Sequence, residues 1–384
     1  MDLSLSEEQR LLGEAASRFI AGRYSFEQRR TIVQSSDGFS RDIWREMAEL
    51  GWLGLPFAEE FGGLGGGTVD IGIVMEAIGR ALMVEPYLST VVLCGGLIGA
   101  LAAPEQKREL LPPIAEGKAL VALAHSEPQA RFALEDVATM ATQSGEGWHL
   151  SGRKEVVIGA PSANQLLVSA RIAGGQHDRK GIGVFVVPAK AKGLTSVDFP
   201  TLDGGRASNL ELDEVLVGPE ALLGDSHDAL PSIEAAVDRA ISALAAEAVG
   251  CMQMLLETTI AYTKTRVQFG QPLAANQVLR HRMVDMAVRI EEAKASALKC
   301  ALSMDSLDAA TRSRAASAAK AKVGRCGRYV AEQAVQLHGG MGVTEELNVG
   351  AYFKRLLAIE VLFGTPHFHL QRHVRLGREA GRAA

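Results

Sequence analysis

The spacing of hydrophobic positions changes twice along the chain. Up to about residue 118 it repeats every three or four residues, as between Leu12 and Ile20, which predicts helices. From about 119 to 230 the apolar runs are short, β-branched and bounded by glycine, which predicts strands. Helical spacing then returns to the end. We therefore predict three domains, with boundaries at 1–118, 119–230 and 231–384.

Long helices joined by short connections are predicted in the last domain, and such a pattern is typical of an antiparallel bundle. We predict that the middle domain is a small β-barrel or β-sandwich. The predicted helices of the bundle cover 233–269, 273–305, 311–338, 345–361 and 367–379.

Composition narrows the class of protein. Hydrophobic residues make up 47% of the 384 positions and charged residues 22%, an ordinary balance for a globular chain. The net charge of −5, without a basic block, argues against a nucleic-acid partner. Four widely spaced cysteines show no metal-ligand or disulfide pattern, so we expect no metal site and a cytoplasmic location.

Targeting and membrane signals are weak. The first residues are acidic and lack an apolar core, unlike a signal peptide. The apolar stretch around 91–103 contains three glycines and is too short to cross a bilayer, so we predict a buried helix and no membrane partner.

Three segments place glycine, which lets a backbone approach a ligand closely, beside hydrogen-bonding side chains. An arginine such as Arg266 suits a pyrophosphate, and the Gly339-Gly340 pair can turn backbone N–H groups toward an anion. Thr365 is expected to begin a helix, where a hydroxyl and N–H groups can meet phosphate oxygens. Each segment alone also fits a plain structural role at a helix end. The segments are 266–272, 336–342 and 363–367.

Taken together and in this order, the three segments resemble the acyl-CoA dehydrogenase family. The opening of the chain, the segment 51–56 with the glycine loop after it, and Ser126-Glu127-Pro128 match as well, so the resemblance covers essentially the whole chain. It implies an α+β fold with an N-terminal helical domain, a β-domain and a C-terminal four-helix bundle. FAD is then expected between β-domain and bundle, reaching a neighbouring subunit.

The resemblance also assigns roles to single positions. Residues of the first segment are expected to meet the FAD of the neighbouring subunit, those of the third to lie near its ADP part, and one β-domain residue to bond the flavin ring. The expected contacts are Arg266, Phe269 and Gln277 in the first, Gln336, Gly339 and Gly340 in the second, Thr365 and His367 in the third, and Ser126 in the β-domain.

The chain departs from the family where the family usually places its catalytic glutamate, because Phe363 stands there. That glutamate removes the α-proton of the acyl-CoA, and a phenylalanine accepts no proton. Some relatives carry the base on the first bundle helix instead, but the matching position is Ala240. The β-domain departs too: the family's glycine-rich stretch is here 129–132, so Arg131 either replaces the lost backbone donors or fills the pocket.

Three carboxylates remain near these positions. Glu247 lies two helical turns beyond Ala240 in an apolar surround, which makes it a candidate base. It also fits a buried glutamate paired with a bundle arginine. We expect Asp238 at the surface or at a cap, and Glu360 to bond within the bundle.

Both departures resemble one branch of the family, which includes pimeloyl-CoA dehydrogenase. There, two homologous subunits form a mixed tetramer, and the small subunit lacks the base but helps to hold its partner's FAD. The segments 24–29, 84–88 and 354–360 match such small subunits.

Several hypotheses stay open. The chain is either a dehydrogenase active alone, as a homodimer or homotetramer, or a supporting subunit of a mixed tetramer. An acyl-CoA substrate, possibly dicarboxylic, and an electron-transferring flavoprotein as acceptor are implied by resemblance. Another flavin chemistry, such as an oxidase or an elimination, and a scaffold without catalysis are the remaining alternatives.

Overall fold

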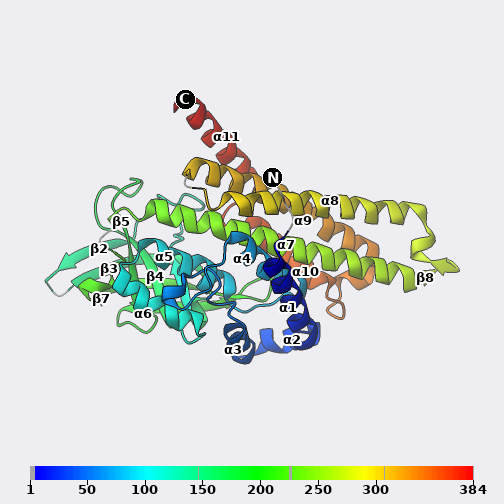
Figure 1. Ribbon diagram of the computed structural model, residues 1–384, viewed down its shortest axis with the longest axis horizontal. Coiled ribbons are helices and arrows are strands. Elements are labelled where there is room, and N and C mark those ends of the chain that lie inside the picture. Colours follow the sequence, from blue (N-terminus) through cyan, green and yellow to red (C-terminus); the bar gives the residue numbers. More distant parts are fainter. Residues whose placement is uncertain (1–4, 146, 225–226, 307, 384) are drawn as a thin grey trace. The chain divides into compact units, whose positions relative to one another are not determined.

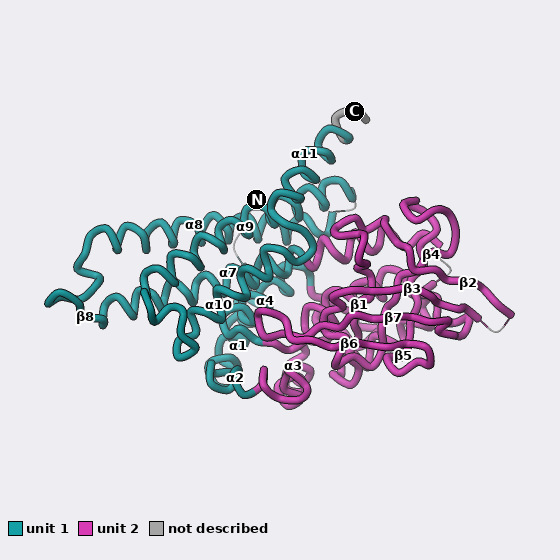
Figure 2. Tube along the Cα trace, turned by 180° about the vertical axis from the view of Figure 1, so that it is seen from behind, with its two compact units in different colours: residues 1–31, 67–83, 241–384 teal, residues 32–66, 84–240 magenta. Residues whose placement is uncertain are grey.

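The computed structural model describes residues 5–145, 147–224, 227–306 and 308–383, and side chains to 379. These residues pack into two compact units, coloured separately in Figure 2. Unit 1 comprises residues 1–31, 67–83 and 241–384, and unit 2 comprises 32–66 and 84–240. Because each unit joins segments distant in sequence, the units follow packing, and the three domain boundaries given above remain predictions.

Unit 1 is helical. Two of its helices, α2 and α7, begin or end in unit 2, and a two-stranded hairpin joins α7 to α8 at their tips (Figure 1). Its elements are α1 (Glu7–Arg23), α2 (Phe26–Gln34), α4 (Thr68–Ala81), α7 (Leu230–Thr265), β8 (Val267–Gln268), β9 (Gln271–Pro272), η5 (Leu273–Ala275), α8 (Gln277–Ser303), α9 (Ala309–His338), η6 (Gly339–Val343), α10 (Val349–Val361) and α11 (Pro366–Ala383).

The predicted ends of α8, α9 and α10 are confirmed to within two residues. The predicted end of the first bundle helix at 269 is wrong, because α7 ends at Thr265 and the β8–β9 hairpin follows. Glycine lets α4 approach α7 along its length. A Cβ on Gly79 would lie 2.0 Å from the carbonyl oxygen of Glu247, and one on Gly250 would lie 2.0 Å from that of Glu76. A larger side chain at either position would therefore separate the two helices.

Unit 2 combines helices with the sheet. The apolar stretch predicted as a buried helix is η2 followed by α5, and its residues are largely buried, which confirms that prediction. The elements are α3 (Arg41–Glu49), η1 (Glu59–Phe61), η2 (Tyr87–Gly95), α5 (Gly96–Leu101), α6 (Pro104–Ala115), β1 (Val121–Ala124), β2 (Met140–Ser144), β3 (Gly147–Ile158), η3 (Ala160–Ser162), β4 (Gln165–Arg171), β5 (Ile182–Pro188), β6 (Leu194–Pro200), β7 (Arg206–Val217) and η4 (Pro219–Ala221).

Within the described residues, strands β1 to β7 form one mixed sheet with the order β1-β4-β2-β3-β7-β6, and β5 pairs antiparallel with β4 outside this order. β1 and β4 run parallel, whereas β3 and β7 pair antiparallel with two register shifts. One face is packed by apolar side chains around Trp148 and Phe185, whose ring centroids lie 5.3 Å apart. The β-rich middle of the chain is thus confirmed.

Among the described residues one helix, α7, is long and apolar enough to cross a membrane by length and composition alone. Of its most apolar stretch, 72% is buried within the protein. Core helices of folded proteins share this length and composition, so the finding is weak evidence for a span.

Candidate functional site

The first predicted cofactor segment forms the exposed tip of unit 1. Arg266 follows the last residue of α7, and Gln277 is the first residue of α8. Between them the β8–β9 hairpin carries Phe269 at a φ of +55°, with its side chain 100% exposed. A fully exposed phenylalanine next to exposed hydrogen-bonding groups is typical of a surface that another molecule covers.

The second segment lies at the same end of the bundle. The ring of Tyr262, one turn before Arg266, stacks on His338 with centroids 4.4 Å apart. Its hydroxyl donates to the His338 carbonyl at 3.4 Å. These contacts hold the end of α9, with Gln336, beside the end of α7. The two segments therefore lie side by side within one chain.

Gly339 and Gly340 face open space. A Cβ on either would have no heavy atom within 4 Å among the surroundings compared, and Gly339 has a φ of +58°. Both residues are exposed. The backbone here is thus accessible to a ligand, and a phosphate could approach its N–H groups closely.

The third segment lies elsewhere in unit 1. Thr365 caps α11, because its hydroxyl accepts a hydrogen bond from the N–H of Phe368 at 3.3 Å. Pro366 packs against Gly324 of α9, where a Cβ would lie 3.1 Å from its Cγ. Fifteen residues of helix separate Gly324 from Gly339, or about 22 Å at 1.5 Å per residue. The three segments thus form two separate groups within one chain.

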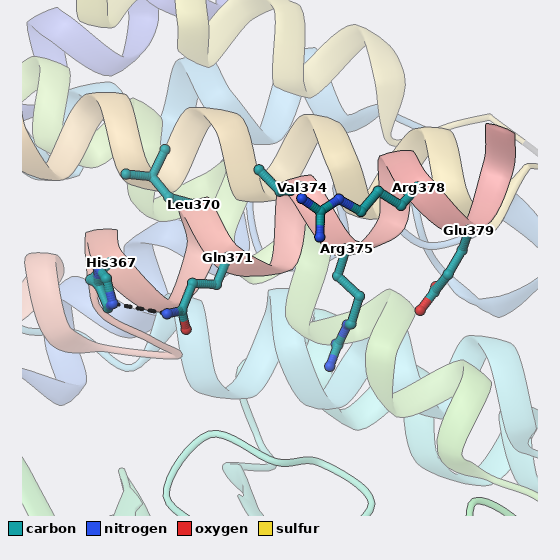
Figure 3. Close-up of a pocket in the computed structure, with 7 residues that line it drawn as sticks. All are labelled: His367, Leu370, Gln371, Val374, Arg375, Arg378 and Glu379. Atoms are coloured by element: carbon teal, nitrogen blue, oxygen red, sulfur yellow. Dashed lines mark hydrogen bonds between the residues drawn. The ribbon is translucent and has the colours of Figure 1, made fainter.

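His367 lines a recess of about 600 Å³ on α11 (Figure 3). Its Nε2 lies 2.9 Å from Nε2 of Gln371. Apolar and basic side chains share the same face of the helix, which gives it both a hydrophobic and a cationic character. The other lining residues are Leu370, Val374, Arg375, Arg378 and Glu379.

In unit 2, Ser126 lies just after β1 with its side chain exposed, and its carbonyl accepts from the N–H of Glu155. The next residue, Glu127, turns inward. Its carboxylate accepts from Lys154 Nζ at 2.6 Å and from the backbone N–H groups of Ala138 and Thr139 at 2.7 and 3.1 Å. This buried group anchors the turn that presents Ser126.

The electrostatics of Glu127 follow from these bonds. Burial alone would raise its pKa. The charge and hydrogen bond of Lys154, with bonds from Gln129 and Thr139, outweigh that effect and lower the pKa from 4.5 to about 2. The carboxylate is therefore ionised at neutral pH.

This pKa gives a stability prediction. A carboxyl whose pKa is depressed in the folded state stabilises the fold above its ordinary pKa and loses that contribution as pH falls. Between pH 4.5 and 2 we expect Glu127 to account for a loss of about 3 kcal/mol in the free energy of unfolding. Urea denaturation across this range measures it, with Glu127→Gln as control. Equal slopes for both proteins would contradict the assignment.

The turn after Glu127 contains the residues predicted to replace the family's glycine-rich stretch. Gln129 donates to Glu127 at 2.9 Å and to Asp136 at 3.1 Å, so its amide is used within the loop. Arg131 adopts a φ of +50°, a conformation that glycine would take more easily, and its side chain is exposed. The loop keeps a glycine-like backbone while presenting a cation.

Phe363, at the position of the usual base, is half-buried in the turn between α10 and α11 with a φ of +57°. Ala240, the alternative position, is fully buried and apolar. Neither side chain can take a proton. That 363 and 240 are the family's base positions remains a prediction.

Glu247 is 2% exposed and is bound by Arg355 through both oxygens, with Nε–Oε1 at 2.6 Å and the second nitrogen–oxygen distance at 2.7 Å. A carboxylate held in this way stabilises the bundle, and both of its oxygens are already occupied. The catalytic role of Glu247 therefore remains a prediction, and the alternative is a purely structural role in the ion pair with Arg355.

The other two carboxylates differ. Glu360 bonds Arg328 Nε at 3.0 Å, which confirms its expected bundle contact. The expectation that Asp238 lies at the surface or at a cap is wrong, because its side chain is fully buried and the residue lies within α7. A charged residue becomes buried when distant partners compensate it, and such partners are not visible in the local sequence.

Sequence reasoning missed two buried residues beside Phe363. Lys320 of α9 is 2% exposed and His369 of α11 is 1% exposed. The signal for Lys320 was present: it sits among Ala316, Ala319 and Val323, on the apolar stripe of its helix. A lysine on such a stripe indicates a buried charge with dedicated partners.

An exposed donor at Arg266, a half-buried one at Thr365 and the open glycines fit a phosphate-bearing cofactor. Arg266 and Thr365 supply donors, and Gly339-Gly340 supplies accessible backbone. Among the described residues, no group of three or more His, Cys, Asp or Glu could hold a metal ion.

Comparison with known proteins gives matches along nearly the whole chain. The family model described as acyl-CoA dehydrogenase, N-terminal domain, matches residues 6–118. The middle-domain model matches 122–215, and the C-terminal-domain model matches 233–375.

Individual relatives agree. The probable acyl-CoA dehydrogenase YngJ of Bacillus subtilis is 30% identical, covering 95% of this chain and 96% of its own. The caffeyl-CoA reductase-Etf complex subunit CarC of Acetobacterium woodii is 28% identical over 94% and 95%. A solved structure, that of a variant of the Tcur3481-Tcur3483 steroid ACAD, is 30% identical with a TM-score of 0.88, covering 99% and 100%.

Proposed function

The chain belongs to the acyl-CoA dehydrogenase family of flavin-dependent oxidoreductases, and from this premise we propose that it binds FAD and supports α,β-dehydrogenation of an acyl-CoA without supplying the base. The observation that carries the proposal is Phe363. The motif places it at the family's usual position of the base, in the turn between α10 and α11. The chain would hold cofactor and substrate, while a homologous partner supplies the glutamate.

Each cofactor residue has a definite task. FAD, when bound, would supply the acceptor for the hydride. The guanidinium of Arg266 would bind phosphate oxygens, and the N–H groups at Gly339-Gly340 would face the same anion. The Thr365 hydroxyl already accepts from the N–H of Phe368, so its own proton is available for a phosphate oxygen. In unit 2, Ser126 would bond the flavin ring.

An assembly of two or more chains is part of the proposal. The two groups of cofactor residues in unit 1 lie about 22 Å apart along α9, and Phe269 is fully exposed. Both features support a cofactor that residues of two subunits bind. The solved relative at 30% identity has a name that joins Tcur3481 with Tcur3483, which supports a mixed assembly over a homotetramer.

The electron acceptor and substrate follow by similarity. CarC is named as a subunit of a reductase-Etf complex, so we propose an electron-transferring flavoprotein as acceptor. An acyl-CoA, with dicarboxylic chains as a subclass to test, is the proposed substrate. We also propose that the chain is cytoplasmic, together with the acyl-CoA and the electron-transferring flavoprotein.

Replacing Arg266 with alanine tests the cofactor site. Hydrogen bonds to charged groups contribute about 1.5–3 kcal/mol each. We therefore expect FAD affinity to fall roughly 10- to 100-fold. Flavin fluorescence titration of the apoprotein measures it. Arg45→Ala, an exposed arginine of α3, is the matched control. Unchanged FAD affinity in Arg266→Ala would remove this residue from the site.

The deciding experiment uses the chain expressed alone. Its FAD-to-chain ratio is measured first, and the flavin is then reduced anaerobically with pimeloyl-CoA and with a short-chain acyl-CoA. Little flavin, or bound flavin that neither thioester reduces, supports the subunit role and directs a search for the partner. Full flavin with rapid bleaching would overturn it in favour of a self-sufficient enzyme. Rapid reoxidation by air would instead indicate an oxidase.

A further inference from the structure

A buried lysine donates hydrogen bonds to the backbone of the turn that contains Phe363. Lys320 of α9 is 2% exposed, and its Nζ donates three hydrogen bonds to backbone carbonyls. The acceptors are the carbonyls of Ile359 at 2.7 Å, Glu360 at 2.8 Å and Gly364 at 2.8 Å. All three N–H bonds of the ammonium are therefore used on a stretch of six residues that includes position 363.

A second buried donor completes this contact. His369 of α11 lies with Nε2 2.9 Å from the carbonyl oxygen of Phe363 and Nδ1 3.3 Å from the hydroxyl of Ser317. Burial lowers the pKa of His369 to about 4, so the ring is neutral and carries one proton. The bonding assigns that proton to Nε2, which donates to Phe363, while Nδ1 accepts from Ser317.

These two side chains occupy the end of α10, where the last carbonyls of a helix have no partner within the helix. Water or a local cap usually satisfies such carbonyls. Here the Lys320 side chain from another helix does so out of contact with solvent. Burial lowers the pKa of Lys320 to about 7, and in the protonated form, which three carbonyl acceptors favour, its charge also suits the negative end of the helix dipole. Dedicated donors at four carbonyls, those of residues 359, 360, 363 and 364, leave the turn little freedom.

The backbone that they hold is unusual. Phe363 has a φ of +57° and Gly364 a φ of +124°. A bulky residue rarely adopts the left-handed region, and it persists there only when surrounding contacts enforce it. Gly324, one turn after Lys320, lets the turn approach α9: a Cβ there would lie 3.4 Å from Glu360 Cγ and 3.1 Å from Pro366 Cγ.

We infer that Lys320 and His369 are positioning residues that fix the backbone at 363, so that whichever side chain stands there is presented in one direction. This inference rests on the proposed function, because it concerns the position of the missing base. The chain therefore lacks the carboxylate at position 363 but has the hydrogen bonds that would orient it. A glutamate introduced at 363 would find its orientation already set.

The first test measures the backbone and needs no activity. Hydrogen–deuterium exchange is followed at the amides of Leu362 and Gly364, which bond the carbonyls of Ala358 and Val361. In Lys320→Met we expect exchange at these amides to accelerate at least about tenfold while the helix interiors stay protected. Lys322→Met, on the same helix with an exposed ion pair to Glu292, is the control and should leave both amides unchanged. Unchanged exchange in Lys320→Met would overturn the inference.

The second test asks whether orientation matters for chemistry. In the Phe363→Glu background, adding Lys320→Met should lower the rate of flavin reduction up to about 100-fold, because small misplacements of a reacting group cost this much. The dissociation constant of the acyl-CoA should stay within about twofold, and Lys320→Arg should recover part of the rate. A full rate in the double variant would overturn the positioning role.

The two tests separate this inference from the proposed function. If Phe363→Glu does not raise the rate of flavin reduction, the proposed function fails at that position. The exchange experiment alone then decides whether Lys320 fixes the backbone at 363. If Lys320→Met does not fold, His369→Ala removes the donor to Phe363 and is measured in the same way. Fast exchange at Gly364 supports the inference, and slow exchange contradicts it.

Discussion

Replacing Phe363 with glutamate is expected to raise the rate at which an acyl-CoA reduces the flavin of the isolated chain by about 10²–10⁴-fold. This is the usual contribution of a positioned general base. The new carboxylate would take the α-proton that no side chain at 363 or 240 can now accept. Because donors from Lys320 and His369 hold the carbonyls around position 363, the new side chain needs no rearrangement of the turn.

The measurement is anaerobic stopped-flow reduction of the flavin by pimeloyl-CoA and by a short-chain acyl-CoA. Phe363→Gln is the matched control, since it has the size and polarity of glutamate but accepts no proton at neutral pH. A rise in Phe363→Glu alone assigns the gain to the base. An equal rise in both would assign it to the loss of the phenyl ring. No rise in either would mean that the pocket is closed for another reason.

The helices of the bundle were predictable because their apolar positions repeat with helical spacing over long stretches. The interval 311–338 was predicted for the helix that spans Ala309–His338. The hairpin after Thr265 was not predicted, although Gly270 and Pro272 stand in it, because no proline interrupts the run before them. Local sequence propensity is enough to predict long helices, whereas short irregular segments depend on the tertiary contacts around them.

The candidate site divides in the same way. The ends of α9 and α10, where motif residues lie, followed from the glycines, since these mark helix ends. The end of α7 did not, because Thr265 lies four residues before the position predicted from Gly270. The partners inside the fold did not. Glu247 and Arg355 are 108 positions apart, and the sequence indicated only the type of partner, a bundle arginine. Lys320 binds carbonyls, which carry no signature in a sequence at all.

Breaking the Glu247–Arg355 pair should destabilise unit 1 by about 3–5 kcal/mol, because one partner is left charged and buried without the other. Both side chains are shielded, with exposed fractions of 2% for Glu247 and 19% for Arg355. Arg355→Met is therefore expected to lower the midpoint of urea denaturation sharply. Glu247→Gln should cost less, because the amide oxygen still accepts one hydrogen bond.

The same variants decide between the two roles of Glu247. A structural role predicts that Glu247→Leu combined with Arg355→Met recovers much of the lost stability, since an apolar pair of similar volume often replaces a buried ion pair without loss. A catalytic role predicts instead that Glu247→Gln abolishes any flavin reduction by the isolated chain while its stability changes little. Full retention of activity in Glu247→Gln would remove it as the base. The bidentate contact at 2.6 and 2.7 Å favours the structural outcome, because an arginine that holds both oxygens competes directly with a substrate proton.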